Sequence, residues 1–182
     1  MHDIVSKGIS HGIYIVTVRT KNTINGMTAA LISQVSFHPL MLMVSVAPER
    51  YTHGLIKESG YFAINTLAEN QKDIVKHFGF KSGRKIDKFK GISYFDAPNG
   101  SPVLSEAIAF FECRLADTFK AGDHTLFIGE VVTAKLLKSD IQPMIFRRGD
   151  FFLVPSYLQN QNIFRRDFLY LFQKYFILPH QR

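Results

Sequence analysis

Cations placed beside glycines are the first residues in this sequence that suggest chemistry. In the stretch FGFKSGR (78–84), Lys81, Ser82 and Arg84 lie next to two glycines. A guanidinium can bind an oxyanion through two parallel hydrogen bonds, and an ammonium group acts as a point charge, so this loop suits a phosphate group. An ordinary solvated loop can have the same composition, so charge alone leaves both interpretations open.

A second cationic stretch, APERYTH (47–53), follows an apolar run and precedes a short segment of helical pattern. Arg50, Thr52 and His53 would then lie close to a helix N-terminus, where backbone N–H groups and a nearby guanidinium favour an anion. The alternative is a capped helix whose charges are solvated.

Small and hydroxylated residues gather in a third stretch, NGMTAALISQVS (25–36). Beside a turn, such residues allow backbone N–H groups to approach a ligand closely, and their hydroxyl groups can donate to phosphate or ring carbonyl oxygens. A turn that leads into a strand with small residues packed inside is the alternative. The candidate binding residues here are Asn25, Met27, Thr28, Ala29, Ala30, Ser33, Gln34 and Val35.

A single histidine, His124, stands in GDHTLFIGE (122–130), at an expected turn into a strand. From that position a polar side chain can reach a cleft, which makes His124 the candidate catalytic residue; a histidine hydrogen-bonded within the turn is the alternative. Cys113 lies in an apolar run and is expected to be a buried, unreactive thiol.

The common signatures of nucleotide, metal and hydrolase sites are missing. The sequence contains no GxGxxG, GxxxxGK[ST], CxxC, HExxH or GxSxG pattern, and its seven histidines show no metal-ligand spacing. We therefore expect no metal site, and any nucleotide must bind through another kind of scaffold.

The elements that must position these residues are mostly short strands. Period-2 alternation over residues 12–20, with similar runs further along the chain, predicts a mainly β domain. Asn25 and Gly26 form a hairpin-turn signal, and residues 27–36 fit strand or helix by pattern alone. The other expected strands cover residues 40–47, 62–67, 107–116, 125–137, 144–147 and 151–154.

Two segments have helical patterns. They are residues 52–59, with Thr52 as the N-cap, and residues 69–78, with Gly79 as the stop signal. Residues 81–105 are rich in Gly, Pro, Ser and Lys and are expected to be mainly loop. Strands do not alternate with long helices, so a doubly wound nucleotide-binding fold is not expected.

Composition fits one folded domain. The chain has 182 residues, of which 46% are hydrophobic and 13% aromatic, enough to form a core rather than a disordered chain. Five basic residues against one acidic residue in segment 81–90, and four against one in residues 158–182, account for the whole net charge of +7. The remainder is balanced, so no extended basic face for nucleic acid is indicated.

The sequence also shows no pattern typical of a membrane helix, a signal peptide or a disulfide-bonded secreted protein. No apolar run reaches the roughly 18–20 residues of a membrane helix. The first ten residues lack a signal-peptide pattern, and one cysteine excludes an internal disulfide. A cytoplasmic protein without a transmembrane segment is therefore expected.

Together, in their order and spacing, the four stretches resemble the flavin reductase-like, FMN-binding split β-barrel family, in particular flavoredoxin and the flavin domains fused to rubredoxin. The resemblance runs from about residue 8 to residue 154. It rests on the segments GIYIVTV, NGMTAALISQVSFHP, LMLMVSVAPERYTHGLIKESGYFAINTL, HFGFKSGRKIDKF, GSPVL, FFECRL and GDHTLFIGEVV.

The resemblance implies a Greek-key split β-barrel with a few α-helices over residues 1–157, which binds FMN, or alternatively FAD, at the interface of a homodimer. It implies that residues 25–30 and 33–35 line the isoalloxazine ring and the ribityl chain. Arg50, Thr52 and His53 would lie near the ribityl phosphate, and Lys81, Ser82 and Arg84 would close over it. His124 would face the flavin where the nicotinamide approaches.

The activity implied by the resemblance is an NAD(P)H:flavin oxidoreductase, in which hydride passes from the nicotinamide to flavin N5 and a redox protein or a monooxygenase is a further partner. A flavoredoxin-like FMN electron carrier, reduced by a redox partner rather than by NAD(P)H, is the main alternative. A split barrel that has lost flavin is a third, and a nucleic-acid module is a distant fourth.

Residues 158–182 fall outside the resemblance. Their aromatic residues recur at helical spacing and predict an amphipathic helical extension that docks on the domain or across the dimer. Attachment to a membrane surface or a partner is the alternative. The aromatic face consists of Phe164, Phe168, Leu171, Phe172, Tyr175 and Phe176.

Overall fold

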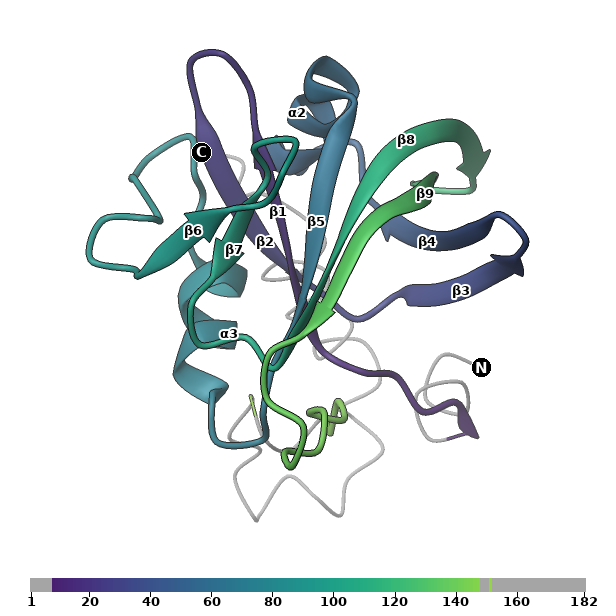
Figure 1. The fold of residues 1–182 in the computed structure, drawn as a ribbon. Helices are drawn as coiled ribbons and strands as arrows, with labels where there is room; N and C mark the ends of the chain where they lie inside the picture. Colours follow the sequence, from purple (N-terminus) through teal and green to yellow (C-terminus); the bar gives the residue numbers. More distant parts are fainter. Residues whose placement is uncertain (1–7, 148–150, 152–182) are drawn as a thin grey trace, which may run out of the picture.

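The computed structural model describes residues 8–147 and Phe151. Two helices occur in this part, α2 (Tyr51–Ser59) and α3 (Lys72–Phe80) (Figure 1). The strands are β1 (Tyr14–Arg19), β2 (Ile24–Ala29), β3 (Ile32–Phe37), β4 (Leu40–Val46), β5 (Tyr61–Thr66), β6 (Tyr94–Asp96), β7 (Pro102–Leu104), β8 (Ala109–Ala121) and β9 (His124–Leu136). The predicted extension 158–182 lies outside the described residues. No helix within the described ranges is long and apolar enough to cross a bilayer.

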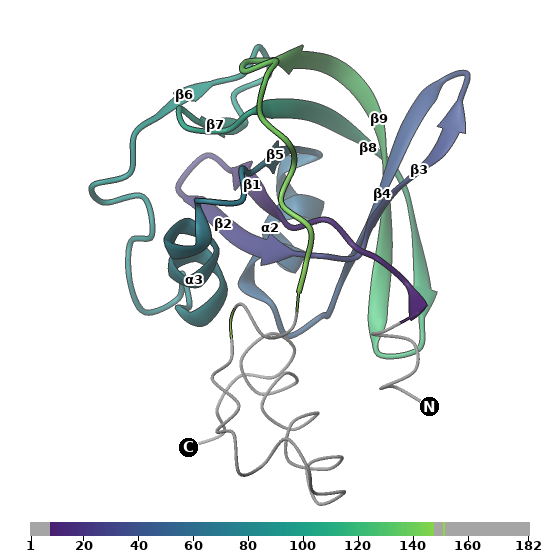
Figure 2. The ribbon, with the colours of Figure 1, turned by 90° about the horizontal axis from the view of Figure 1, so that it is seen from below.

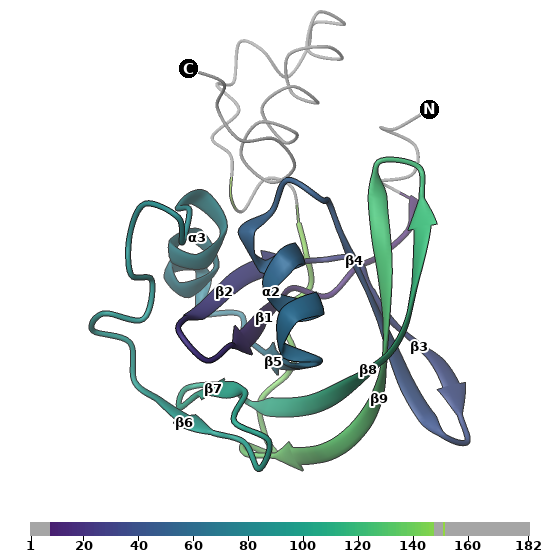
Figure 3. The same ribbon diagram turned by 90° about the horizontal axis from the view of Figure 1, so that it is seen from above.

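Seven antiparallel strands form one curved sheet in the order β2-β1-β5-β8-β9-β4-β3. The two edge strands, β2 and β3, are consecutive in the sequence and are joined by only Ala30 and Leu31, so the sheet has to bend until its edges approach each other. Figures 2 and 3 show the resulting barrel from its two ends. The predicted mainly β barrel with a few helices is confirmed.

Strand β1 is buried on both faces and separates two cores. Val16 and Val18 pack inside the barrel with Phe127, and α2 adds Leu55 and Ile56 to this core. The alternate residues Ile13 and Ile15 pack on the other face with Phe78 of α3. The period-2 pattern of the strand therefore marks two buried surfaces, each covered by one of the helices (Figure 3).

The predicted turn at Asn25 and Gly26 is wrong. Both residues lie within β2, and the β1–β2 turn is formed by residues 20–23, where Thr20 N–H donates to the Thr23 carbonyl at 2.8 Å. Gly26 lies under the Phe78 ring, which would be 2.8 Å from a Cβ at that position. The glycine thus allows α3 to pack closely on β2, and the Asn-Gly pair serves contacts rather than a turn.

Both predicted helices exist, with different ends. Arg50 rather than Thr52 stands at the N-cap of α2, and neither helix has a side-chain cap hydrogen bond. Helix α3 runs through Gly79 to Phe80. Thr52 is used differently because its hydroxyl accepts a hydrogen bond from Asn25.

The strand predictions differ from the structure mainly in length. Segment 27–36 is split between β2 and β3, and β8 extends five residues beyond the predicted 107–116. The expected loop 81–105 contains the short hairpin β6–β7. Residues 144–147 form only one isolated bridge, between Gly12 and Ile145, and residues 152–154 lie outside the described part.

Packing at Gly129 of β9 gives a stability prediction. A Cβ there would lie 2.6 Å from the Phe62 ring and 2.7 Å from Cys113 Cβ, and both neighbours are fully buried. We expect Gly129→Ala to lower the free energy of unfolding by about 1–3 kcal/mol through overpacking, measured by urea denaturation. Gly54→Ala in α2 is the control, because nothing lies within 4 Å of its added Cβ. It should raise stability by about 0.5–1 kcal/mol, and equal effects of the two changes would contradict the packing argument.

Candidate functional site

Three separate segments meet at Asn25 of β2. Asn25 is buried, and its Nδ2 donates to Thr52 Oγ1 in the first turn of α2 at 2.9 Å. The backbone of Gly83, in the loop after α3, lies against the same side chain, so that a Cβ on Gly83 would overlap with Asn25 Oδ1. Strand β2, the start of α2 and the 81–90 loop are therefore held together around one buried amide.

Arg50, at the N-cap of α2, carries an unsatisfied buried guanidinium. Its Nε and Nη2 atoms are buried and have no hydrogen-bond partner among the described residues. Burial lowers the pKa of Arg50 to about 10, and nearby Glu49 partly opposes this shift. The group stays charged at neutral pH, and a buried cation without a partner is costly unless a ligand supplies an anion.

Lys88 places a second cation beside Arg50. It is 4% exposed, and its Nζ donates to the carbonyls of Gly26 at 2.9 Å and Phe78 at 2.8 Å. Burial, and then the charge of Arg50, lower the pKa of Lys88 to about 7. Sequence reasoning missed Lys88, because nothing in the pattern separates it from the four other cations of segment 81–90.

Arg84 completes the group of cations. Its Nη1 donates to the carbonyl of Glu49 at 2.9 Å, and its guanidinium lies over the Tyr51 ring, 5.0 Å from the centroid. Arg50 at the N-cap of α2 is thus joined by two cationic residues of the 81–90 loop, Arg84 through Glu49 and Tyr51, and Lys88 through its electrostatic interaction with Arg50. A phosphate group is the ligand that this arrangement suits best, since guanidinium groups and helix N-termini both favour it.

The other predicted loop residues lie at the exposed surface. Lys81 Nζ donates to His77 Nδ1 at 3.4 Å, and Ser82 Oγ accepts from Arg84 N–H at 3.3 Å. These bonds hold the loop against the end of α3. The contact of Lys81 and Ser82 with a ligand stays a prediction.

His53 is directed to the opposite side of α2. It is buried, its Nε2 is 2.9 Å from Thr125 Oγ1, and its ring meets Phe127 edge-on with centroids 5.0 Å apart. Burial and the charge of Lys57 lower the pKa of His53, so a neutral ring is favoured. The structure gives His53 a clear packing role, fixing α2 to the start of β9.

The stretch 25–35 is divided between several environments. Thr28 Oγ1 donates to the Val75 carbonyl at 2.7 Å, which ties β2 to α3. Ala29 belongs to the barrel core, while Met27 and Ala30 pack beside the two cores. Ser33, Gln34 and Val35 are exposed on the edge strand β3. Only Asn25 of this stretch meets the cation cluster directly, and flavin contacts of the others stay predictions.

His124 lines a cavity of about 440 Å³ between α2 and the β8–β9 hairpin. Its Nδ1 donates to Asp123 Oδ1 at 2.7 Å, which leaves Nε2 as the other polar ring atom. Glu49 connects the two regions, because it lines this cavity while its carbonyl accepts from Arg84. The cavity is lined by Pro48, Glu49, Lys57, Thr118, Lys120, Gly122, Asp123, His124 and Thr125.

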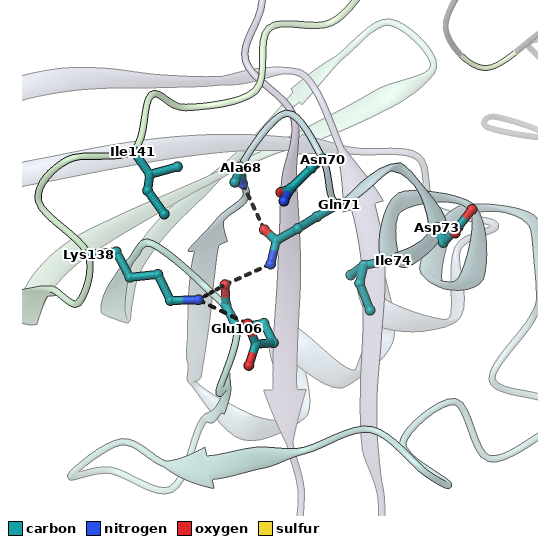
Figure 4. A pocket seen from close by; sticks show the side chains of 8 residues that line it. All are labelled: Ala68, Asn70, Gln71, Asp73, Ile74, Glu106, Lys138 and Ile141. Carbon is teal, nitrogen blue, oxygen red and sulfur yellow. Dashed lines mark hydrogen bonds and ion pairs between the residues drawn. The ribbon is translucent and has the colours of Figure 1, made fainter.

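A second cavity, of about 300 Å³, lies at the N-terminal end of α3 (Figure 4). Its polar groups bind one another: Gln71 accepts from Ala68 N–H at 2.7 Å and donates to the Glu106 carbonyl at 2.7 Å. Lys138 Nζ is paired with Glu106 Oε2 at 3.0 Å. Because these partners are satisfied within the chain, the cavity has the character of a structural junction.

Metal chemistry has no candidate in the described ranges, since no three His, Cys, Asp or Glu side chains come together there. Cys113 is buried, and burial raises the pKa of its thiol to about 12. The expected burial of this thiol is confirmed, and the raised pKa disfavours the reactive thiolate.

Comparison with known proteins gives the family. Residues 6–154 match the model of the flavin reductase like domain. The high molecular weight rubredoxin of Moorella thermoacetica is 36% identical over 76% of this chain, and the match covers 61% of that protein. The ferric-chelate reductase (NAD(P)H) of Archaeoglobus fulgidus is 34% identical, over 71% of this chain and 78% of its own length.

A solved structure agrees with these relatives. An FMN-binding protein from Thermus thermophilus, with bound 1-cyclohex-2-enone, superimposes with a TM-score of 0.67 at 32% identity, covering 70% of this chain and 71% of its own. The chain belongs to the flavin reductase-like domain family, as its sequence resemblance indicated. The chain spans about three fifths of the first of these relatives.

The unsatisfied guanidinium of Arg50 gives a second prediction. We expect Arg50→Met to raise the melting temperature of the ligand-free protein, because it removes a buried cation that lacks a partner. Added inorganic phosphate at about 100 times its Kd should stabilise the wild type by about 2.7 kcal/mol, and the variant by well under 1 kcal/mol. Thermal unfolding with and without phosphate measures both effects.

Arg114→Met is the matched control, because Arg114 is exposed and forms a surface ion pair with Glu130. It should leave the phosphate effect unchanged. A fall in the melting temperature of ligand-free Arg50→Met, with phosphate stabilisation intact, would show that Arg50 serves packing and not an anion.

Proposed function

We propose that this protein is an FMN-binding flavoprotein that acts as an NAD(P)H:flavin oxidoreductase. The observation that carries the proposal is the Arg50 guanidinium, whose buried Nε and Nη2 have no hydrogen-bond partner among the described residues, with Lys88 and Arg84 near it. A phosphate monoester, with close to two negative charges at neutral pH, matches these cations. Family membership supplies the flavin to which that phosphate belongs.

FMN fits these residues better than FAD does. The cations converge on one place from the N-terminus of α2 and the 81–90 loop, and Gly83 closes against Asn25 beside them. A terminal phosphate can be surrounded in this way, whereas the phosphates of FAD are linked onward to an adenosine. The Thermus thermophilus relative, which is named an FMN-binding protein, supports this choice.

In the proposed reaction a flavin held by these residues would supply the redox chemistry, as the acceptor of a hydride from the nicotinamide. The residues of this chain bind and orient the two ligands. Arg50, Arg84 and Lys88 hold the phosphate end, and the positive charge also favours an anionic reduced ligand. Hydride transfer needs no strong acid or base, which agrees with the lack of a catalytic dyad in the cation cluster.

His124 is proposed to meet the nicotinamide. The cavity that it lines is next to the cation cluster, on the other side of Glu49, and its ring is oriented by the bond from Nδ1 to Asp123. The Nε2 atom can then exchange a hydrogen bond with a bound amide group. The relative named as a ferric-chelate reductase (NAD(P)H) supports a nicotinamide donor.

A homodimer is part of the proposal. The edge strand β3 and the start of β4 expose Val35 (51%), Phe37 (78%) and Leu40 (38%). A second copy covering this apolar edge would bring Ser33, Gln34 and Val35 to an interface, where they can line a flavin. This accounts for predicted binding residues that lie apart from the cation cluster within one chain.

A flavoredoxin-like electron carrier is the second candidate. It is favoured by the similarity to a high molecular weight rubredoxin, because rubredoxin is itself a redox protein. In this case FMN stays bound, and electrons come from a protein partner instead of NAD(P)H. The binding residues would be the same, and only the role of the His124 cavity would differ.

Spectroscopy tests the proposed function. The purified protein should retain added FMN through gel filtration, and its visible flavin band should bleach on anaerobic addition of NADH or NADPH. Arg84→Ala should weaken FMN binding by about tenfold, since it removes a charge-assisted hydrogen-bonding group, and Lys81→Ala should act in the same direction with a smaller effect.

The control is Lys135→Ala, an exposed lysine on β9 that should leave FMN affinity unchanged. Flavin that binds but stays oxidised in the presence of both nicotinamides would favour the electron carrier. A protein that takes up no FMN would contradict both candidates.

A further inference from the structure

Lys88 joins three elements that surround the cation cluster. Its Nζ donates to Gly26 in β2 and to Phe78 in the last turn of α3, while its own carbonyl accepts from His77 Nε2 at 2.7 Å. The residue thus fixes the loop that carries Lys81, Ser82 and Arg84 to the strand that carries Asn25. Lys88 therefore acts as a tether that holds the loop of the proposed phosphate site to β2 and α3.

The charged groups around Lys88 leave its ammonium without an acidic partner. The charge of Arg50, at the N-cap of α2, lowers the pKa of Lys88, and the charge of Glu49 acts on Arg50 by raising its pKa. Asp87, the adjacent loop residue, accepts from Phe89 N–H at 2.8 Å. From α3, His77 uses its two ring nitrogens for the Lys88 carbonyl and for Lys81 Nζ.

The bonds of Lys88 can be made by a neutral amine as well as by an ammonium group. A neutral amine has two N–H groups, which is the number of carbonyls that Lys88 contacts. The third proton only adds charge beside Arg50 at a buried position. Burial lowers the pKa of Lys88 to about 7, with the charge of Arg50 contributing. An anion bound at Arg50 would counter the repulsion by Arg50 and favour the charged form of Lys88.

We propose that Lys88 is a positioning residue that makes the site selective for a phosphorylated flavin, because it becomes charged when the phosphate binds. Phosphate recognition is thereby coupled to the 81–90 loop, which Lys88 holds against β2 and α3. This inference rests on the proposed function. The added proton comes from solvent: neutral Lys88, one proton and the flavin phosphate dianion give a complex in which the Lys88 ammonium is balanced by the phosphate. Riboflavin, which has no phosphate, offers no such balance.

Isothermal titration calorimetry tests the coupling directly. FMN is titrated into the wild-type protein at pH 8 in two buffers with different ionisation enthalpies, and the difference in heat gives the number of protons taken up. At pH 8 a phosphate monoester is already a dianion. We expect an uptake approaching one proton per site for FMN and none for riboflavin.

The pH dependence of affinity has a defined sign. Because the free site has Lys88 largely neutral above its pKa of about 7, FMN affinity should fall as the pH rises above 7, by at most about tenfold per pH unit. Riboflavin affinity should stay flat over the same range. A wild-type protein that binds FMN without proton uptake would overturn the inference, and this outcome requires no variant.

The Lys88→Met variant tests whether Lys88 is the group that takes up the proton when FMN binds. It keeps most of the unbranched side chain and removes the amino group, so it should abolish proton uptake and weaken FMN binding at pH 7 by about tenfold or more, with riboflavin affinity within about threefold of wild type. Lys85→Met, at an exposed lysine of the same loop, is the control and should behave like wild type.

Three outcomes would contradict the inference in different ways. Proton uptake that persists in Lys88→Met would assign it to another group. Equal weakening of FMN and riboflavin would reduce Lys88 to a structural tether without phosphate selectivity. Failure of the wild-type protein to bind FMN at all would overturn the proposed function itself, and with it this inference.

Discussion

Closure of the sheet is the constraint on which the rest of the structure depends. Its two edge strands, β2 and β3, follow one another in the sequence with only Ala30 and Leu31 between them, so the other five strands must form the wall that brings those edges back together. Strands β8 and β9, with thirteen residues each, bend within this wall at two register shifts. The position of α2 at one end of the barrel follows from this geometry.

Helix α2 is then fixed on two sides by polar contacts. Asn25 of β2 binds Thr52 on one side, and Thr125 of β9 binds His53 on the other. The helix begins directly after Pro48 and Glu49, so its N-terminus lies between the cation cluster and the His124 cavity. One short helix thereby sets the spacing of the two regions that the proposed function assigns to the phosphate and the nicotinamide.

Buried carboxylate and amide side chains elsewhere in the fold have hydrogen-bond partners within the protein, and the Arg50 guanidinium differs from them in this respect. Glu112 is fully buried, yet its carboxylate accepts from the backbone N–H groups of Asn99 and Ser101 at 3.1 and 3.2 Å. Asn65 is likewise satisfied, donating to Thr17 Oγ1 and accepting from Leu104 N–H. Among the described residues, the buried side-chain atoms left without a hydrogen-bond partner are Nε and Nη2 of Arg50 and Oγ of Ser101, and of these only the Arg50 atoms belong to a charged group. An unpaired buried charge costs more than an unpaired hydroxyl, which is why the proposed function assigns an anionic ligand to Arg50.

The sequence predicted the architecture more reliably than the contacts. Period-2 alternation identifies strands because successive side chains point to opposite faces, and in β1 the two sets of side chains pack into two different cores. The Asn25–Gly26 signal failed because the same residue pair also serves close packing under Phe78, which depends on α3, about fifty residues away in the chain. Local patterns cannot distinguish a glycine needed for a turn from one needed for a close contact.

The residues of the candidate site also divide into those that the sequence identifies and those that only the folded structure identifies. Arg50 and Arg84 could be selected from sequence, because a guanidinium near a helix start or a glycine has a recognisable local setting. Lys88 could not, because its importance comes from burial and from two carbonyls contributed by β2 and α3. A tether of this kind has no local signature. The role of Lys88 is recognised only in the three-dimensional structure, where this one lysine of the loop is buried against the barrel near a second cation, Arg50. The charge that makes this position unfavourable in the free protein is also what makes a phosphate dianion complementary to it, so the cost in stability and the selectivity of the proposed site have the same physical origin.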